Sequence, residues 1–365
     1  METKKLIDCC EFISDGDHLP PPKSDSGVPF ITISNITGQN KLSFEDTMFV
    51  PESYYNGLNE NKKAKKGDIL YSVVGSFGKP VYVDFDKQMV FQRHIAILRP
   101  KRNVNARFIY YTMLNPQFYK LVDKLAIGCS QRTVTLDTLR NIEVNLPDKD
   151  IQDKMVGILS LIDEKIDINN NVNDNLSAMA YDIYMHNFFS KKPNAKLKDI
   201  LTESEKSAIQ VGEAKTSNGE YPFFTSGATI LKWNEPFVDG RNCFLNTGGN
   251  ADVKFYVGKA AYSTDTWSIS AKSEMSDYLY LMLFSIKPEL DQKFFQGTGL
   301  KHLQKPLLKD RPIYVPEKLE LEAFNRQVIP MFDIISENTR ENQQLTSLRD
   351  WLLPMLMNGQ ATISD

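Results

Sequence analysis

Long apolar runs, paired cysteines and a strong excess of charge of one sign are all missing from this sequence. No run reaches the roughly 18 apolar residues of a membrane-spanning helix, and the charged residues 1–8 lack the apolar middle of a signal peptide. The cysteines show no C-x-x-C spacing, so we expect neither a zinc site nor a disulfide framework. They are Cys9, Cys10, Cys129 and Cys243. These absences favour a cytoplasmic protein whose cysteines are reduced packing residues.

The length of the chain indicates more than one folded unit, because 365 residues with 41% apolar content exceed what one compact core usually needs. The net charge of −3 is unevenly distributed. Residues 1–147 and 191–316 each carry +3, whereas residues 148–190 carry −5 and residues 317–365 carry −4. Basic blocks that alternate with acidic ones are typical of a DNA-binding protein with solvated helical spacers, although excesses this small also arise by chance.

The sequence also repeats itself once, with a period near 170 residues that suits a duplicated domain. Four features recur in the same order: a short amphipathic stretch, an apolar strand containing proline, a glycine turn that leads into a second strand, and a helix. In the first copy they lie at residues 5–8, 28–32, 75–83 and from Arg107, and in the second at residues 196–201, 221–225, 248–257 and from Asp277.

The end of each copy has a fixed length. From Gly128 to Pro147 and from Gly297 to Pro316 the interval is 19 residues, and each interval closes on a short apolar strand, at 142–146 and 313–315. We therefore expect an α+β protein with two copies of one mixed domain.

A long helical pattern follows each closing proline, and its apolar positions alternate in steps of four and three, as in a coiled coil. The first seam is Met155, Leu159, Ile162, Ile166, Asn169, Asn173, Leu176, Ala180 and Ile183. The second is Phe324, Val328, Met331, Ile335, Asn338, Asn342, Leu345, Arg349, Leu352 and Leu356. Adjacent asparagines in each seam predict a register-specified antiparallel helix pair, while two helices packed separately on their own domains remain the alternative. Pro330 marks either the start of the second helix or a kink in it.

Such helices would set a fixed distance between the two heads. About 35 residues span roughly 50 Å, which is comparable with one to one and a half turns of B-DNA between half-sites. Two heads at opposite ends of the pair, related by a pseudo-two-fold axis, would each meet a major groove. Because the heads differ in sequence, the DNA site would be bipartite and asymmetric.

Two variable heads that alternate with two long helices resemble the layout of type I restriction-modification specificity subunits over essentially the whole chain. The resemblance is carried by the two head-to-helix junctions, Gly128 to Pro147 followed by residues 151–156, and Gly297 to Pro316 followed by residues 324–329. The second head is shorter and its junction is four residues longer. The implied domains are residues 1–150 and 191–317 for target recognition, 151–190 and 318–358 for the spacer helices, and 359–365 for a tail.

The same resemblance implies a non-catalytic subunit without a cofactor or metal. Its implied partners are double-stranded DNA, two methylation subunits and, for cleavage, restriction subunits. We expect partner helices to dock on the apolar helix ends at residues 179–189 and 345–356.

Groove readout needs polar side chains at exposed loop positions, so we expect DNA contacts in the loops after the central strands. In the first head the candidates are Ser72, Ser76, Lys79, Gln92, Arg93, His94, Gln131, Arg132 and Thr133. In the second they are Asn246, Thr247, Asn250, Lys254, Thr264, Asp265, Lys301 and His302, with Thr264 and Asp265 matched to Gln92 and Arg93. Each of these residues could equally be a solvated surface residue.

Two other functions leave weaker signals in the sequence. Residues 115–118, Asn-Pro-Gln-Phe, resemble the Asn-Pro-Pro-aromatic motif of amino methyltransferases, but the second proline and a glycine-rich cofactor loop are absent. The acidic residues 163–165 are interpreted as surface charge, and the histidines have no triad or metal-ligand spacing. A coiled-coil adaptor whose heads bind protein rather than DNA remains open.

Overall fold

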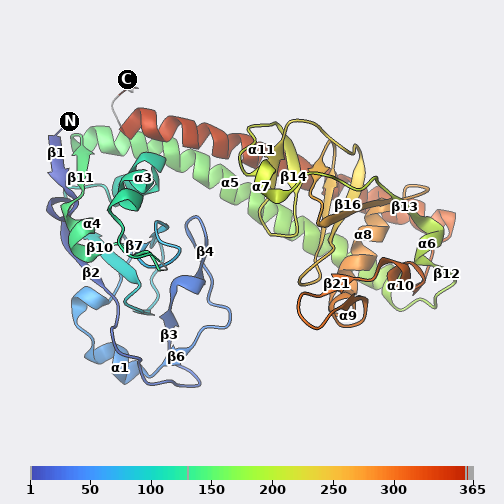
Figure 1. Cartoon of the computed structure of the whole chain (residues 1–365), viewed down its shortest axis with the longest axis horizontal. Helices are drawn as coiled ribbons and strands as arrows, with labels where there is room; N and C mark the ends of the chain where they lie inside the picture. The colour runs from blue at the N-terminus through green and yellow to red at the C-terminus, as the bar shows by residue number, and fades with distance from the viewer. Residues whose placement is uncertain (1, 130, 358–359, 361–365) are drawn as a thin grey trace. The chain divides into compact units, whose positions relative to one another are not determined.

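The computed structural model describes residues 2–129, 131–357 and 360 (Figure 1). Of the expected tail, 359–365, all but Gln360 lie outside the described residues. The chain folds into two compact units, which we call the first unit (residues 1–164 and 345–365) and the second unit (residues 165–344). None of the helices in the described residues is long and apolar enough to cross a membrane.

The head of the first unit is built on a four-stranded antiparallel sheet in the order β2-β10-β7-β8. Its strands are β2 (Cys10–Asp15), β7 (Ile69–Ser72), β8 (Pro80–Tyr82) and β10 (Ile95–Pro100). A smaller sheet pairs β3 (Val28–Ile31) antiparallel with β6 (Phe49–Val50) and parallel with β9 (Val90–Phe91). Strand β1 (Glu2–Lys5) pairs with β11 (Glu143–Leu146) and so joins the two ends of the head.

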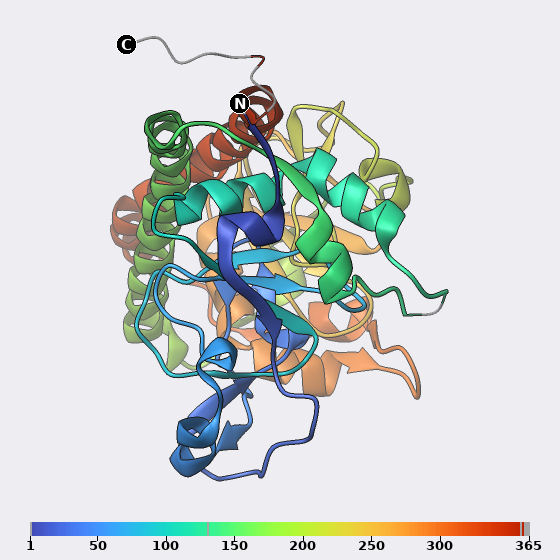
Figure 2. The same cartoon turned by 90° about the vertical axis from the view of Figure 1, so that its left-hand side faces the viewer.

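Short helices and one hairpin complete this head, which faces the viewer in Figure 2. They are η1 (Leu6–Cys9), η2 (Ile33–Asn35), β4 (Ile36–Gly38), β5 (Lys41–Leu42), α1 (Glu52–Gly57), η3 (Glu60–Lys62), α2 (Ala106–Leu114), α3 (Pro116–Leu125) and α4 (Leu136–Asn141). The residues that resemble a methyltransferase motif are a helix start: the Asn115 side chain caps α3 by accepting from the Gln117 amide, and Pro116 occupies the first turn.

The head of the second unit repeats the four-stranded sheet, the three-stranded sheet and the terminal strand pair of the first. Its four-stranded sheet has the order β13-β19-β16-β17, and its small sheet again has one antiparallel and one parallel pairing around β14. The duplication predicted from the sequence is therefore confirmed in the fold. The strands are β12 (Ala195–Lys196), β13 (Leu201–Glu203), β14 (Tyr221–Phe224), β15 (Leu231–Trp233), β16 (Arg241–Asn246), β17 (Val253–Val257), β18 (Ala261–Tyr262), β19 (Thr266–Ala271), β20 (Phe295–Gln296), β21 (His302–Leu303) and β22 (Pro312–Ile313).

The helical segments of the second head are likewise short. They are η4 (Met185–Phe189), α6 (Leu197–Ile200), α7 (Val211–Ala214), α8 (Ser276–Ser285), α9 (Lys287–Glu289), η5 (Leu290–Phe294) and α10 (Lys305–Lys309). As expected, α2 and α8 begin near Arg107 and Asp277.

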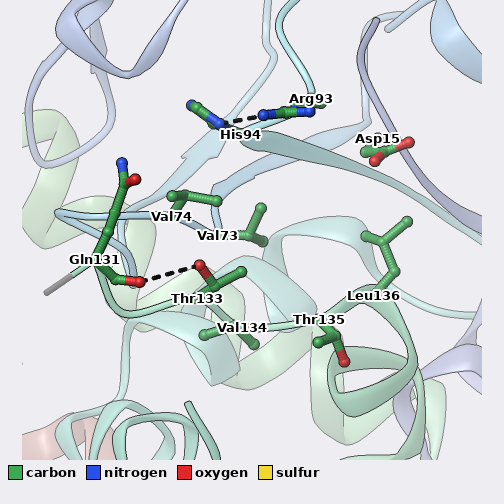
Figure 3. Close-up of a pocket in the computed structure, with 10 residues that line it drawn as sticks. All are labelled: Asp15, Val73, Val74, Arg93, His94, Gln131, Thr133, Val134, Thr135 and Leu136. Atoms are coloured by element: carbon green, nitrogen blue, oxygen red, sulfur yellow. Dashed lines mark hydrogen bonds between the residues drawn. The ribbon is translucent and has the colours of Figure 1, made fainter. Parts of the chain in front are cut away.

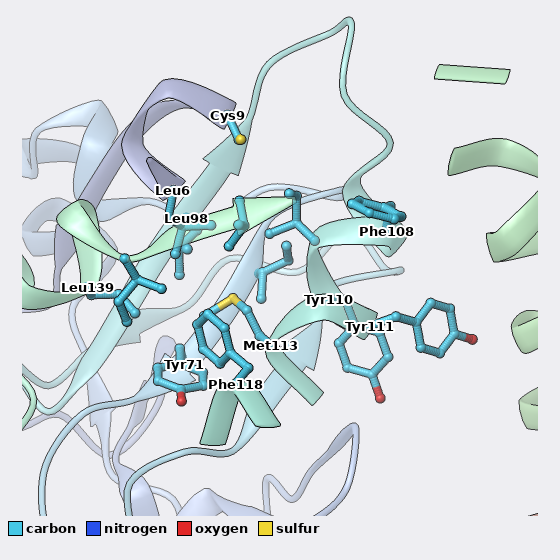
Figure 4. Close-up of a cluster of buried hydrophobic side chains, with 14 of the residues drawn as sticks. Leu6, Cys9, Tyr71, Leu98, Phe108, Tyr110, Tyr111, Met113, Phe118 and Leu139 are labelled. Carbon is cyan, nitrogen blue, oxygen red and sulfur yellow. The ribbon is translucent and has the colours of Figure 1, made fainter. Parts of the chain in front are cut away.

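Each head has its main core between its four-stranded sheet and one apolar helix. In the first head, Phe108 and Met113 of α2 point with Phe118 of α3 into the cluster that includes Tyr71 of β7 (Figure 4). Full burial of a side chain of this size contributes about 1.5–3 kcal/mol. The same cluster contains Leu159, so the helix pair completes the core that one head alone would leave open.

Helices α5 (Lys149–Tyr184) and α11 (Lys318–Met357) run antiparallel, as the sequence predicted. In the second unit the Asn169 amide donates to Asn342 at 2.9 Å and the Asn338 amide donates to Asn173 at 2.8 Å. From the first pair to the second, the residue number in α5 rises while the residue number in α11 falls, so the two helices run in opposite directions. Helix α11 starts at Lys318, so the alternative in which it begins at Pro330 is wrong.

Each head is also joined to a long helix by an arginine–aspartate ion pair. In the first unit Arg349 of α11 pairs with Asp163 of α5 at 2.9 Å, and Asp163 also accepts from the Tyr111 hydroxyl. In the second unit Arg241 of β16 pairs with Asp277 of α8 and Asp333 of α11, each at 2.6 Å. The interpretation of Asp163 as surface charge is therefore wrong, because the fold brings Arg349 and Tyr111 to it.

Candidate nucleic-acid interface

Three loops meet at one end of the four-stranded sheet of the first head. We call them the turn loop (residues 73–79), the entry loop (92–94) and the bridging loop (127–135, of which 130 lies outside the described residues). Because β7 and β10 are antiparallel neighbours, the end of β7 lies beside the start of β10. The Val73 amide donates to the His94 carbonyl at 2.9 Å, and the Val134 amide donates to the Val73 carbonyl at 2.8 Å. Backbone hydrogen bonds thus hold the three loops together.

Two glycines shape these loops. Gly75 has φ +68°, a left-handed conformation that glycine adopts without steric cost, and its amide donates to the Arg132 carbonyl at 2.9 Å. Gly128 has φ +96°, and a Cβ atom placed there would lie 2.7 Å from the Gln131 carbonyl oxygen. The bridging loop therefore cannot keep this path with any other residue at position 128.

The loops enclose a hollow of about 300 Å³, shown in Figure 3. Arg93 and His94 lie on one side of it, and residues of the bridging loop lie on the other. Four side chains predicted as DNA contacts are thus brought together: Arg93, His94, Gln131 and Thr133. The hollow is also lined by Asp15, Val73, Val74, Val134, Thr135 and Leu136.

Arg93 and His94 form a coupled pair at the edge of the hollow. The Arg93 Nε donates toward His94 Nε2 at 3.5 Å. Burial lowers the pKa of His94, and the positive charge of Arg93 lowers it further. A neutral imidazole can accept this hydrogen bond, so His94 orients the guanidinium while remaining uncharged near pH 7.

Other predicted residues of the first head have structural roles. Ser72 is fully buried, and its hydroxyl donates to the Ser76 carbonyl and accepts from the Lys79 amide, so it holds the turn loop and is not available to DNA. Arg132 pairs with Asp123 and lies over the Phe77 ring. Ser76 and Lys79 are exposed on the turn loop, and Gln92 is half-buried in the entry loop.

The second head contains the same loop framework. The Thr247 amide donates to the Asp265 carbonyl at 3.0 Å, the Gly249 amide to Lys301 at 2.9 Å, and the Leu303 amide to Thr247 at 3.0 Å. Gly249 and Gly297 repeat the left-handed glycines, with φ +81° and +152°.

These bonds correct one prediction. The amides of Arg93 and Thr264 occupy equivalent places, donating to the carbonyls of Asp17 and Ile209. Thr264 and Asp265 therefore match Arg93 and His94, one residue later than the sequence suggested.

Several predicted residues of the second head are also occupied by contacts within the protein. Asn246 is buried and donates to the carbonyls of Ser226 and Asn250, so it holds the turn as Ser72 does. Lys254 donates to the Thr225 carbonyl and pairs with Asp252, and Lys301 pairs with Asp291 at 2.8 Å. The predicted residues that remain exposed are Asn250, Asp265 and His302, and Thr247 and Thr264 are half-buried.

Sequence reasoning missed two residues of this framework, Asp15 and Lys305. Asp15 ends β2 and lines the first hollow. Lys305 stands eight residues after Gly297, as Leu136, which lines the first hollow, stands after Gly128. Its ammonium group lies 4.8 Å from the centre of the Trp267 ring, and burial lowers the pKa of Lys305.

Comparison with known proteins agrees with this architecture. The family model described as type I restriction modification DNA specificity domain matches the chain twice, at residues 1–178 and 191–346. The HindI type I specificity subunit of Haemophilus influenzae is 22% identical, over 82% of this chain and 87% of its own. The MjaIX specificity subunit of Methanocaldococcus jannaschii is 19% identical, over 73% of this chain and 71% of its own.

Among solved structures, the S subunit of a type I restriction-modification system from M. genitalium has a similar fold. Its TM-score is 0.60 at 15% sequence identity, and the match covers 100% of this chain and 96% of that one. Two matches to one family model, each on a head with its following helix, account for most of the sequence. The chain therefore belongs to the type I restriction-modification DNA specificity family, with two copies of the family's domain.

Proposed function

We propose that this chain reads a bipartite, asymmetric DNA sequence on behalf of a type I restriction-modification complex. The observation that carries the proposal is the loop framework, which recurs bond for bond in both heads while its exposed side chains differ. Backbone bonds fix where a side chain is presented, and side-chain chemistry then selects the base edge that it contacts. Two heads with the same framework and different side chains would read two different half-sites.

The readers that we propose are the side chains left exposed by the fold. In the first head Arg93, Gln131 and Lys79 supply donors, and in the second Asn250, Asp265 and His302 supply both donors and acceptors. Ser72, Arg132, Asn246 and Lys254 shape the loops instead. The paired asparagines of the helix pair would fix its register, because a mismatched register leaves their amides without partners.

Methylation and restriction subunits are the partners that we propose, with catalysis residing in them. Partner helices would dock on apolar side chains of α5 and α11 that face away from the helix seam. The exposed members of the two predicted ends are Met179, Phe189, Leu348 and Trp351. Phe188, Leu353 and Leu356 are buried in the cores of their own units, so they are not docking residues. The adaptor alternative gains no support from a family model whose description names DNA specificity.

The test is to co-express the full chain with its methylation subunit in a host free of DNA methylation and to sequence the modified bases. We expect one split motif with two different halves, since the exposed side chains of the two heads differ. The methylation subunit expressed alone is the control and should leave no such motif. Methylation without a sequence motif, or a motif that the control reproduces, would refute the proposal.

A further inference from the structure

We propose that Arg93 is a specificity-determining residue that reads a guanine in the half-site of the first head, an inference that rests on the proposed function. Guanine presents two acceptors, N7 and O6, in the major groove, and the planar guanidinium offers two parallel N–H donors that match them. Three observations support this role for Arg93: no acid in the described part of the chain pairs with its side chain, backbone hydrogen bonds hold its loop in place, and the second head has a different residue at the equivalent position.

Arg93 is available because no acid among the described residues pairs with it. Three other arginines of this head are held by acids: Arg99 pairs with Asp68 at 2.7 Å, and Arg132 pairs with Asp123. Arg140 donates to the Ile13 carbonyl and pairs with Asp137. Removing any of these from its partner would leave a carboxylate or a carbonyl unsatisfied, whereas Arg93 is exposed beside the hollow and can bind a base without breaking an ion pair.

Arg93 is also well positioned, because its loop is held from both sides. Its own amide donates to the Asp17 carbonyl at 3.0 Å, and the preceding Gln92 amide donates to Ile31 at 2.9 Å. The Nε atom donates toward His94, which leaves the two terminal nitrogens as the free fork. Because the backbone of its loop is already held, Arg93 loses less conformational freedom when it binds a base than a residue of an unsupported loop would.

The second head has no counterpart of this group. Thr264 occupies the place of Arg93 and Asp265 the place of His94, and neither can offer a two-donor fork. Gln131 lies across the hollow from Arg93. Its counterpart in the second head is the apolar residue Leu300, because each is the third residue after its loop glycine. A guanine read in this manner therefore belongs to one half of the site.

The experiment compares Arg93→Gln with Arg102→Gln in the full chain, co-expressed with the methylation subunit and followed by sequencing of the methylated motif. Arg102 is the matched control, because it is an exposed arginine of the same head that lies beyond the other end of β10. We expect the wild-type motif to require a guanine in one half. Arg93→Gln should reduce that preference roughly 10- to 100-fold at that single position, with adenine gaining most, because glutamine matches the adenine edge. Arg102→Gln should leave the motif unchanged.

The unaffected half-site is an internal control for folding and assembly. If Arg93→Gln retains both halves of the motif with the same base preferences, Arg93 does not read DNA and the inference fails while the proposed function stands. Equal loss of both halves would mean that the substitution acts through stability or assembly, and this also overturns the inference. If the wild-type complex methylates no defined motif, the proposed function itself fails.

Discussion

The two heads have the same loop framework but different side chains at the positions that the framework presents. Ser72 and Asn246 illustrate how the framework tolerates change: a hydroxyl in one head and an amide in the other each donate to the carbonyl four residues later. Where a side chain forms no such bond, as at Arg93 and Thr264, its chemistry is free to differ. Under the proposed function, this separation of loop support from base contact would let one fold specify two unrelated half-sites.

The heads also differ in how their charges are balanced. In the first head Arg93 and Lys79 are exposed, whereas in the second head Lys254 and Lys301 are paired with aspartates. Free cations contact phosphates and release counterions, but paired ones do so less effectively. Under the proposed function, we therefore expect the first head to contribute more of the salt-dependent affinity.

The largest expected effect tests the arginine–aspartate ion pairs that join each head to a long helix. Asp277→Ala removes a fully buried carboxylate that accepts two hydrogen bonds from Arg241, and leaves Arg241 with Asp333 and the Ile329 carbonyl. We expect a loss of about 3–5 kcal/mol in the free energy of unfolding. Asp163→Ala should cost less, because Asp163 is partly exposed whereas Asp277 is fully buried, and Arg349 keeps Asp350 and Gln39 as partners. Urea unfolding of the full chain measures both variants. A larger loss of unfolding free energy for Asp163→Ala than for Asp277→Ala would contradict this account of how the heads are held to the helices.

An intermediate effect tests the glycine of the bridging loop. A Cβ atom at Gly297 would lie 2.6 Å from the Leu300 carbonyl oxygen at φ +152°, so Gly297→Ala should cost about 1–3 kcal/mol and impair recognition of the second half-site. Gly299→Ala is the control in the same loop, because nothing lies within 4 Å of its Cβ position. Sequencing of the methylated motif and thermal unfolding measure the two effects. Equal behaviour of the two variants would show that the loop path is not required.

The smallest effect tests the entry loop of the first head. The pKa of His94 is lowered from its ordinary value of 6.5, so the unfolded chain binds a proton at this residue more readily than the folded chain does. Its contribution to stability is therefore present above about pH 6.5 and is lost as the pH falls below that value. We expect the wild type to lose slightly more stability than His94→Asn between pH 7.5 and 5.5, as measured by urea unfolding at each pH. Parallel pH profiles of the two proteins would exclude this role.

Much of the fold could be predicted from the sequence because its signals are local and periodic. The heptad steps placed Asn169 opposite α11, and the equal intervals after Gly128 and Gly297 identified the duplicated bridging loop. The candidate site was predicted less well. Local pattern identified loops rich in polar residues, but Ser72, Arg132 and Lys254 proved to be occupied by partners within the protein, and Lys305 was missed.

The sequence by itself determined the duplication, the helix seams and the glycine positions, because periodicity and positive φ angles are properties of consecutive residues. Only the tertiary structure decided which polar side chains are free to contact DNA. Lys254 is occupied by the Thr225 carbonyl, 29 residues away in sequence, and Asp163 by Arg349, 186 residues away. Such partners meet only when the sheet and the helix pair have formed, so the reading surface follows from packing and not from any single segment.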